Sequence, residues 1–312
     1  MSPVGRPFLH SLRDVNTPVV PQSRRGQRVR FELAILGPTI VKEHGVVVAL
    51  RPRELDVLAA LALHHPHPVS IDAIADVLWA TPPATVTKSV QMHISRVRSV
   101  LGADAIVTEG TAYRLGPEWE LDADRLEDHL ARARRSTRAG DHAMSRVLLE
   151  AARTEVRGVP FATLPATAET MGERARREQQ LLSADEDLVL AYLSTQDAPA
   201  AVALAAALVE AEPYRENRWM MLAVGQYRNG QRRESLRTLR RGRDVVLEMA
   251  GLATSVASAR LESWILADDP VLERLSPAHL VGHGDPTDSA DLQQLFIGRS
   301  ELLDSCVRIR EG

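Results

Sequence analysis

The sequence predicts a mainly α-helical protein with a small β component: an N-terminal winged helix-turn-helix followed by an all-α, tetratricopeptide-like helical-repeat domain. Three observations predict this fold class. Strand-like alternation of apolar residues, three segments with helical spacing and a second pair of strand patterns follow one another before residue 117. Beyond residue 120 the spacing is helical almost throughout. Part of that region repeats at an interval of about 34 residues.

Composition limits the class of protein. The 312 residues indicate roughly two domains. Only 4% of them are aromatic, so the cores must consist mainly of aliphatic side chains, which favours stacked helices. The single cysteine, Cys306, excludes an intrachain disulfide and a multi-cysteine zinc site. No apolar run reaches the roughly 18 to 20 residues that span a bilayer, so we expect a soluble cytoplasmic protein that does not bind membranes.

The N-terminal region predicts an arm followed by a small antiparallel sheet. Residues 1–28 contain four prolines and end in a basic cluster, which predicts a flexible arm that is either a solvated tail or a contact to the DNA backbone. Apolar residues alternate over 29–35, and Gly37-Pro38 ends that strand. Two further strand patterns, 39–42 and 46–50, flank a turn signal at 43–45.

Three helices and a hairpin come next. Pro52 suits the first position of one helix, and Ser70 is a good N-cap for a second. The third helix has an apolar face and ends at Gly102. Short strands at 105–108 and 112–115 form a hairpin pattern, which is the expected wing. The apolar face of the third helix consists of Val86, Val90, Ile94, Val97 and Leu101.

The third helix has the chemistry of a helix that enters the major groove of DNA. No Asp or Glu occurs between Ala84 and Leu101, although the chain has a net charge of −3. DNA repels a carboxylate on such a face, whereas Lys and Arg release counterions from it. The alternative is a solvated helix with a few cations. The polar positions expected to face DNA are Thr87, Lys88, Gln91, Ser95, Arg96 and Arg98.

Spacing separates two roles among these side chains. Lys88, Gln91 and Ser95 lie at i, i+3 and i+7, so they project from one stripe that reaches base edges. Gln pairs with adenine through two groups and Lys bonds guanine acceptors, whereas Arg96 and Arg98 are expected to contact phosphates. In the wing we expect Thr108 and Thr111 to bond phosphates or sugars and Arg114 to add positive charge, although Glu109 reduces it.

The helical region contains an internal repeat. Gln196 and Ala201 correspond to Gly230 and Ser235 at an offset of 34 residues, and Gly140 with Ser145 repeats the spacing earlier. Small residues at these places allow neighbouring helices to approach closely, and stacking buries faces that a single helix pair leaves exposed. An arginine-rich stretch, 232–243, overlaps the last repeat. It is either a solvated face or a surface for DNA or an acidic partner.

These motifs together resemble a known family. Residues 52–55, 69–79, 89–102 and 107–115 resemble the OmpR-type winged helix, and more narrowly the antibiotic regulatory protein family of actinobacteria, often called SARP. Five stretches of the helical region resemble the bacterial transcriptional activation domain of that family. They are 121–122, 140–141, 156–161, 212–217 and 227–231.

The resemblance implies a transcriptional activator. Members bind directly repeated promoter elements as a homodimer or a side-by-side pair and recruit RNA polymerase through sigma and other subunits, so control of secondary-metabolite genes is expected here. It implies a DNA-binding domain at 29–117 and an activation domain at 120–270. The connection that corresponds to the polymerase-contact loop consists of Ala80, Thr81, Pro82 and Pro83.

Residues 271–312 predict a linker and the start of a further domain. Residues 295–303 resemble the opening of an NTPase module, yet the sequence contains no G-x-x-x-x-G-K-[ST] motif, so we interpret the chain as a fragment of a longer protein. We expect no catalytic residues, no metal and no cofactor. Two alternatives stay open: a helical-repeat signalling scaffold, and the regulatory half of a larger NTPase switch.

Overall fold

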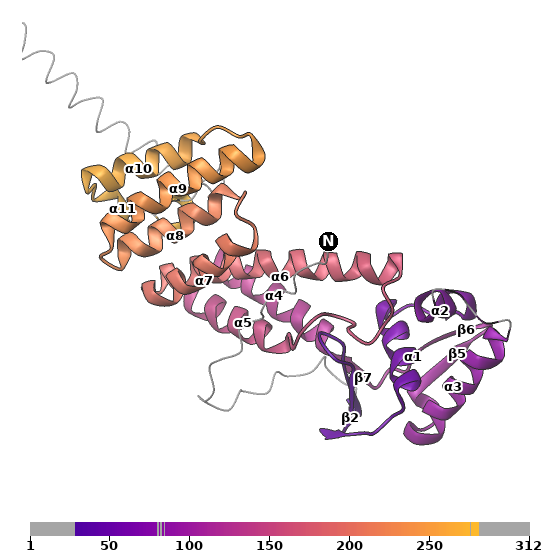
Figure 1. Cartoon of the computed structure of the whole chain (residues 1–312). Coiled ribbons are helices and arrows are strands. Elements are labelled where there is room, and N and C mark those ends of the chain that lie inside the picture. The colour runs from indigo at the N-terminus through magenta and orange to yellow at the C-terminus, as the bar shows by residue number, and fades with distance from the viewer. Residues whose placement is uncertain (1–28, 80, 82, 84, 275, 281–312) are drawn as a thin grey trace, which may run out of the picture. The chain divides into compact units, whose positions relative to one another are not determined.

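The computed structural model describes residues 29–79, 81, 83, 85–274 and 276–280 (Figure 1). The chain forms two compact units that divide between Ala184 and Asp185, within one long helix. Each unit is described separately below. The predicted arm at 1–28, the predicted NTPase start and Cys306 lie outside the described residues, as do Ala80 and Pro82.

The N-terminal unit begins with a four-stranded sheet. Strand β1 pairs antiparallel with β2 and parallel with β7, and β3 pairs with β2, which gives the order β3-β2-β1-β7. The turn between β2 and β3 places His44 and Gly45 at positive φ, as a tight hairpin turn requires. The strand predicted at 46–50 is shorter than expected. The bounds are β1 Phe31–Ala34, β2 Ile40–Glu43, β3 Val46–Val47 and β7 Trp119–Leu121.

The predicted winged helix-turn-helix is present. Glu54 accepts a bond from the Arg51 amide (2.9 Å) at the start of the first helix, and Ser70 caps the second through the Ala73 amide (3.2 Å). A three-stranded sheet in the order β4-β6-β5 supplies the wing. The bounds are α1 Pro52–Leu63, β4 Val69–Ser70, α2 Ile71–Leu78, α3 Val86–Leu101, β5 Ile106–Glu109 and β6 Ala112–Leu115.

Helices follow the second sheet in chain order. In the N-terminal unit α4 packs against α5, and α6 begins there and continues into the C-terminal unit. In the C-terminal unit α8 packs against both α7 and α9. The bounds are α4 Asp122–Arg138, α5 His142–Glu155, α6 Ala168–Ser194, α7 Ala198–Ala211, α8 Glu216–Arg228, α9 Arg232–Ala250, α10 Val256–Ala267, α11 Val271–Arg274 and α12 Pro277–Leu280.

The internal repeat predicted from the sequence has a structural counterpart. Gly140, Gln196 and Gly230 each end a helix at positive φ (76°, 60° and 74°). After each, the next amide bonds the carbonyl five residues earlier, at 2.9, 2.9 and 2.8 Å. This is a Schellman-type helix end, and a new helix starts directly afterwards. The repeated small residues Ser145, Ala201 and Ser235 are all buried, which confirms the predicted close approach of helices.

Small residues also permit close packing around α8. A Cβ built on Gly225 would lie 3.1 Å from Val202 Cγ2 on α7, and one on Gly242 of α9 would lie 2.5 Å from Trp219 Cγ. Gly225 therefore lies directly against Val202 of α7, and Gly242 lies directly against Trp219 of α8. Trp219 itself is buried and donates from Nε1 to the Pro213 carbonyl (2.8 Å). Among the described residues, none of the helices has both the length and the apolar composition needed to cross a membrane.

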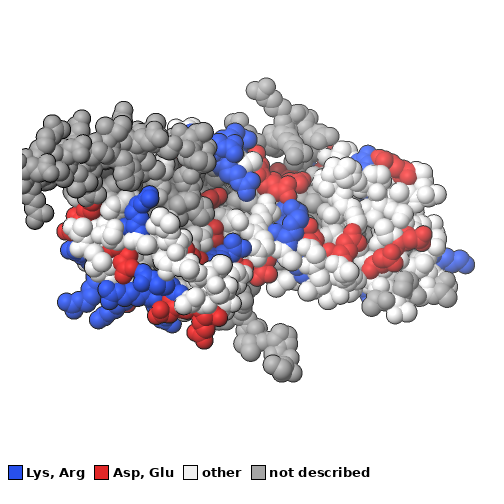
Figure 2. All heavy atoms as spheres, turned by 90° about the horizontal axis from the view of Figure 1, so that it is seen from above, with Lys and Arg blue, Asp and Glu red and all other residues white. Residues whose placement is uncertain are grey.

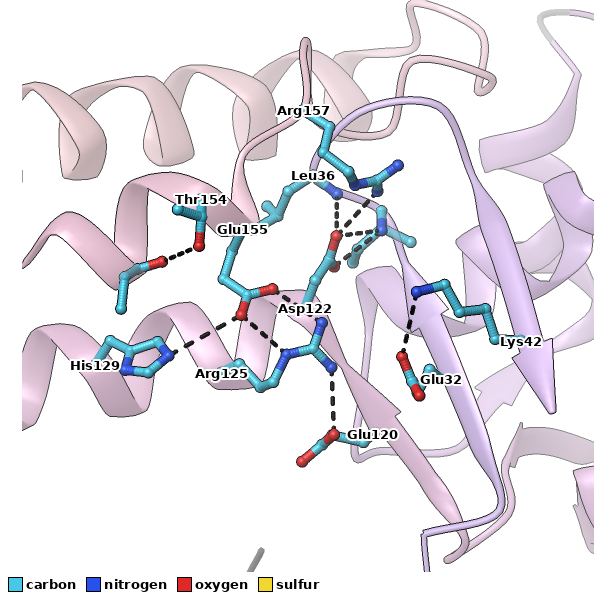
Figure 3. Close-up of polar contacts among 12 residues, drawn as sticks. Glu32, Leu36, Lys42, Glu120, Asp122, Arg125, His129, Thr154, Glu155 and Arg157 are labelled. Atoms are coloured by element: carbon cyan, nitrogen blue, oxygen red, sulfur yellow. Dashed lines mark hydrogen bonds and ion pairs between the residues drawn. The ribbon is translucent and has the colours of Figure 1, made fainter. Parts of the chain in front are cut away.

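A buried carboxylate joins the winged helix to the helices that follow it in the N-terminal unit (Figure 3). Asp122, at the first position of α4, accepts bonds from the Ile35 and Leu36 amides (2.9 Å each) and from Arg157 Nη2 (3.1 Å). The segment after α5 pairs with the same strand end, because the Arg157 amide bonds the Leu36 carbonyl (2.7 Å) and the Phe161 amide bonds the Ile35 carbonyl (2.7 Å). Residues 35–36 are thereby held from two sides.

Ion pairs reinforce this joint. Arg125 donates to both oxygens of Glu155 (3.0 and 2.9 Å) and to Glu120 (3.2 Å), a bidentate geometry that fixes α4 against the end of α5. At the end of α1, His64 lies 3.2 Å from Glu169 and His65 lies 3.7 Å from Asp124. His64 and His65, which lie close together in the sequence, therefore contact carboxylates on α6 and α4.

We expect the N-terminal unit to lose stability in weak acid because of His129. Burial lowers the pKa of this histidine from its usual value of 6.5, although Glu155 lies 4.0 Å away and opposes the shift. A lowered pKa means that the folded state binds fewer protons than the unfolded chain, so the free energy of unfolding falls as the pH drops below about 6.5. Urea denaturation at about pH 7.5 and at about pH 5.5 measures this fall in the free energy of unfolding.

The variant His129→Gln should show a smaller loss of stability between these two pH values than the wild type. The exposed His67 offers a matched control, because His67→Gln leaves the buried ring in place. An identical pH dependence in wild type and His129→Gln would contradict the assignment.

Candidate nucleic-acid interface

The outward face of α3 is a polar stripe open to solvent. Thr87, Lys88, Gln91 and Ser95 are all exposed, while Val90, Ile94, Val97 and Leu101 are buried on the opposite face. The apolar periodicity of the sequence is therefore correct, except that Val86 is only half-buried. The stripe carries one cation and no carboxylate, so its field attracts phosphate along two helical turns.

The N-terminus of α3 adds to this attraction. No acidic side chain lies in the first turn, and the Thr85 side chain makes no capping bond to the helix. The partial positive charge of a helix N-terminus then faces outward beside Thr87 and Lys88. This is the end of the helix that a helix-turn-helix protein inserts into the groove.

Arg98 is engaged within the protein. Its Nε and Nη2 donate to the Ile106 carbonyl (3.0 and 2.7 Å), and Nη2 also donates to Thr108 Oγ1 (2.7 Å). The guanidinium lies 5.8 Å from the centroid of the buried Tyr113 ring. Arg98 thus fastens β5 to α3, a role that spacing alone does not reveal. Its predicted phosphate contact stays a prediction, while Arg96, half-buried one residue from the stripe, keeps its predicted role.

The wing is a tight hairpin with a nearly neutral tip. Thr108 and Thr111 are exposed, and Gly110 takes positive φ (61°) at the turn. Arg114 forms an ion pair with Glu109 and donates to the Leu115 carbonyl (3.2 Å). The wing therefore offers hydroxyl groups to a backbone, and its cation is partly neutralised, as Glu109 in the sequence indicated.

We expect Arg98→Ala to lower the free energy of unfolding by about 2 kcal/mol, because bonds from a charged donor to two acceptors are lost. Arg98→Lys should be almost as destabilising, since an ammonium group lacks the planar fork that reaches both Ile106 and Thr108. Thermal denaturation of the two variants measures this. Full recovery of stability in Arg98→Lys would contradict the fastening role and favour a simple charge contact.

The contact between Arg53 and Trp79, near the predicted polymerase-contact loop, was not predicted from the sequence. Thr81 and Pro83 are exposed. The preceding Trp79 is half-buried beneath the guanidinium of Arg53, which lies 5.6 Å from its ring centroid. Arg53 also donates to the Leu78 carbonyl (3.4 Å). A cation and an aromatic ring 26 positions apart give no sequence signal, because only the packing of α1 on α2 brings them together.

The arginine-rich stretch of α9 is largely paired inside the C-terminal unit. Arg232 donates to the Ile265 and Leu266 carbonyls (2.9 and 2.7 Å), and Arg240 and Arg243 both contact Glu262. Figure 2 shows Lys and Arg side chains gathered at its lower left, with Asp and Glu side chains directly beside them. Glu262 of α10 contacts Arg240 and Arg243 of α9 and weakens the field that α9 presents.

Two family models match the chain. The model described as "Bacterial transcriptional activator domain" matches residues 121–266, and the one described as "Transcriptional regulatory protein, C terminal" matches residues 45–115. Their order along the chain is that of the predicted domains. Together the two matches give the domain architecture of a SARP-type transcriptional activator. The winged helix and the helical repeats are the two parts of that architecture.

Relatives agree with this assignment. The chain is 29% identical over 273 residues to the regulatory protein AfsR of Streptomyces coelicolor, covering 84% of this chain and 27% of AfsR. It is 29% identical over 254 residues to the transcriptional regulator RedD of the same organism, covering 78% of this chain and 72% of RedD. The chain therefore spans about a quarter of the length of AfsR but most of RedD.

A solved structure supports the fold. Mycobacterium tuberculosis EmbR, determined in complex with a low-affinity phosphopeptide, matches with a TM-score of 0.72 at 23% identity. The match covers 81% of this chain and 69% of the EmbR chain. At this identity the likeness concerns the fold alone. It confirms the predicted combination of a winged helix with a helical domain.

Proposed function

We propose that this chain is a sequence-specific activator in which α3 enters the major groove of promoter DNA. The observation that carries the proposal is the exposed, carboxylate-free stripe of Thr87, Lys88, Gln91 and Ser95 beside the hairpin of β5 and β6. A bound duplex would receive Lys88 and Gln91 at base edges, and Arg96 and the wing hydroxyls at phosphates. The protein would act in the cytoplasm and would not be an enzyme.

The helical repeats would supply the activating half. We take 29–117 as the DNA-binding part and 120–270 as the activation part, with residues 80–83 contacting sigma and other polymerase subunits. Binding as a homodimer or side-by-side pair on direct repeats, and control of secondary-metabolite genes, are proposed from the resemblance to the SARP family and not from the geometry. That the chain is the regulatory part of a longer NTPase switch is a separate proposal, resting on 295–303.

The test is DNA binding by Lys88→Ala, with Lys42→Ala as its matched control. A genome-wide binding footprint in the source organism first supplies a promoter fragment. Lys88→Ala should weaken binding to it by about tenfold or more, because a base-edge contact is worth roughly 1–3 kcal/mol. Lys42 lies on β2, where its ammonium is 3.7 Å from Glu32, so its removal should leave affinity unchanged.

Two further measurements sharpen this test. Wild-type affinity should fall steeply as the salt concentration rises. Gln91→Ala should relax the preference at one position of the site while changing affinity less elsewhere. Equal affinity of wild type, Lys88→Ala and Lys42→Ala, with unchanged preference in Gln91→Ala, would reject α3 as the reading helix and favour the alternative of a helical-repeat scaffold.

A further inference from the structure

An exposed methionine lies on the outward face of α3 among polar side chains. Met92 is 42% exposed, and it is not among the positions predicted from the sequence to face DNA. Lys88 precedes it by one helical turn, and Ser95 and Arg96 follow it by one turn. An apolar side chain therefore occupies the middle of the helix that we propose as the reading helix.

Helical geometry places Met92 opposite the buried side of α3. Each residue turns an α-helix by about 100°, and the four buried residues of α3 share one side. Met92 and Ser99 then project almost directly away from that side. Lys88 lies on one flank of this line and Arg96 on the other. A duplex that receives α3 therefore meets Met92 near the centre of the contact.

Met92 also extends further from the helix than its outward neighbours. Ser95 and Ser99 are exposed but short, and the Ser99 hydroxyl donates to the Arg96 carbonyl (2.7 Å) within the helix. Methionine is unbranched and has three rotatable side-chain bonds, so its thioether adapts to the surface that it meets. The central part of this face thus presents a flexible apolar group.

One chemical group in the major groove suits such a side chain. The base pairs present hydrogen-bond donors and acceptors there, and thymine alone adds a methyl group, at C5. Methionine placed over a donor or acceptor removes water from that group without replacing its hydrogen bond, which is unfavourable. Placed over the C5 methyl group, it removes apolar surface of both partners from water, which is favourable.

We propose that Met92 contacts the C5 methyl group of a thymine and thereby determines the base preference at one position of the DNA site. This inference rests on the proposed function, in which α3 enters the major groove. The absence of carboxylates from α3, with Lys88 and Arg96 on the two flanks of Met92, favours DNA as the occupant of this face. Met92 then adds selectivity for thymine that requires no hydrogen bond.

Deoxyuridine tests the contact without altering the protein, because it lacks only the C5 methyl group of thymine. Each thymine of the promoter fragment obtained from the binding footprint is replaced singly, and the Kd is measured by fluorescence anisotropy. At the contacted position the replacement should raise the Kd of the wild type by about fourfold, the effect of losing one buried methyl group. A Kd that no replacement raises would overturn the proposal.

A double-mutant cycle with Met92→Ala assigns the methyl contact to this side chain. Met92→Ala should bind the unmodified fragment about fourfold or more weakly, because the apolar contact is lost. The critical deoxyuridine should then raise the Kd of Met92→Ala by less than about twofold. Met92→Leu, which stays apolar, should keep most of the wild-type response. An undiminished response in Met92→Ala would assign the methyl group to another side chain and overturn the proposal.

Val100 provides the matched control. It is 51% exposed on the same helix, but it points about 80° away from the direction of Met92. Val100→Ala should therefore keep both the Kd and the response to deoxyuridine. The slope of log Kd against log salt should be unchanged in Met92→Ala and smaller by about 1 in Arg96→Ala, because only Arg96 is expected to contact phosphate. A reduced slope in Met92→Ala would contradict a purely apolar contact.

Lys88→Ala separates failure of this inference from failure of the proposed function. Weaker binding by Lys88→Ala, with no response to any deoxyuridine, would reject the Met92 contact and retain α3 as the reading helix. Unchanged binding by Lys88→Ala and unchanged preference in Gln91→Ala would reject the reading helix and the Met92 contact with it. Loss of activated transcription in Met92→Ala at an unchanged Kd would indicate a protein partner for Met92 and overturn the proposal.

Discussion

Replacing Arg218 by alanine is expected to lower the free energy of unfolding of the C-terminal unit by about 3–5 kcal/mol. The Arg218 side chain is 1% exposed and bonds Glu186 (2.6 Å), Glu212 (3.0 Å) and the Leu208 carbonyl (3.1 Å). Its removal leaves Glu186, 13% exposed, without this cation, while Glu212, 11% exposed, keeps its ion pair with Arg215 (2.6 Å). Uncompensated buried charge costs more than the lost bonds themselves.

The comparison for Arg218→Ala is Arg237→Ala on α9. Arg237 pairs with Glu234 at 3.1 Å, but the two side chains are 66% and 52% exposed, so this change should cost less than about 1 kcal/mol. Chemical denaturation followed by circular dichroism measures both variants. Similar midpoints for the two would show that burial of Arg218 does not decide its contribution.

The second large effect is expected at Asp122. Asp122→Ala leaves the Ile35 and Leu36 amides and the Arg157 guanidinium without their acceptor inside the N-terminal unit. Each unsatisfied buried amide costs about 1–3 kcal/mol, so a total of about 3 kcal/mol or more is expected. Hydrogen exchange should report the loss directly at the two amides, in addition to a lower denaturation midpoint.

Asp122→Asn is the informative partner variant. Burial raises the pKa of Asp122 above its usual value, in opposition to the bonds it accepts, so its negative charge is not favourable in itself. An amide oxygen still accepts from a backbone N–H, and the loss should be smaller than for alanine. Equal losses for both variants would mean that charge, and not acceptor geometry, holds the joint.

The elements near the reading helix could be predicted because their signals are local. The buried face of α3, the Ser70 cap and the Gly102 stop depend on residues within a turn or two of each other. The internal repeat could be predicted for the same reason, since Gly140, Gln196 and Gly230 each occupy a helix end that needs positive φ. Gln196 in that position is recognised only by its offset from Gly230.

The contacts that organise the protein could not be predicted in this way. Glu186 stands in a run of three acidic residues, 185–187, which is typical of a solvated helix face, yet it accepts a hydrogen bond from Arg218, 32 positions away. Arg98 lies at a position predicted to contact phosphate, yet its guanidinium donates a hydrogen bond to the Ile106 carbonyl. Pairs so far apart in sequence have no periodic signature, because the chain contains many arginines and carboxylates and the sequence does not show which of them pair.

By itself the sequence determined the order of the elements, the face that α3 buries and the family that the chain resembles. Backbone propensity, capping and apolar spacing act over a few residues, so their effects can be predicted from neighbouring positions in the sequence. The tertiary structure alone decided which charges are buried and paired, and how Asp122 and Arg157 tie the winged helix to the helices beside it. Those choices depend on desolvation, which exists only after distant segments have packed together.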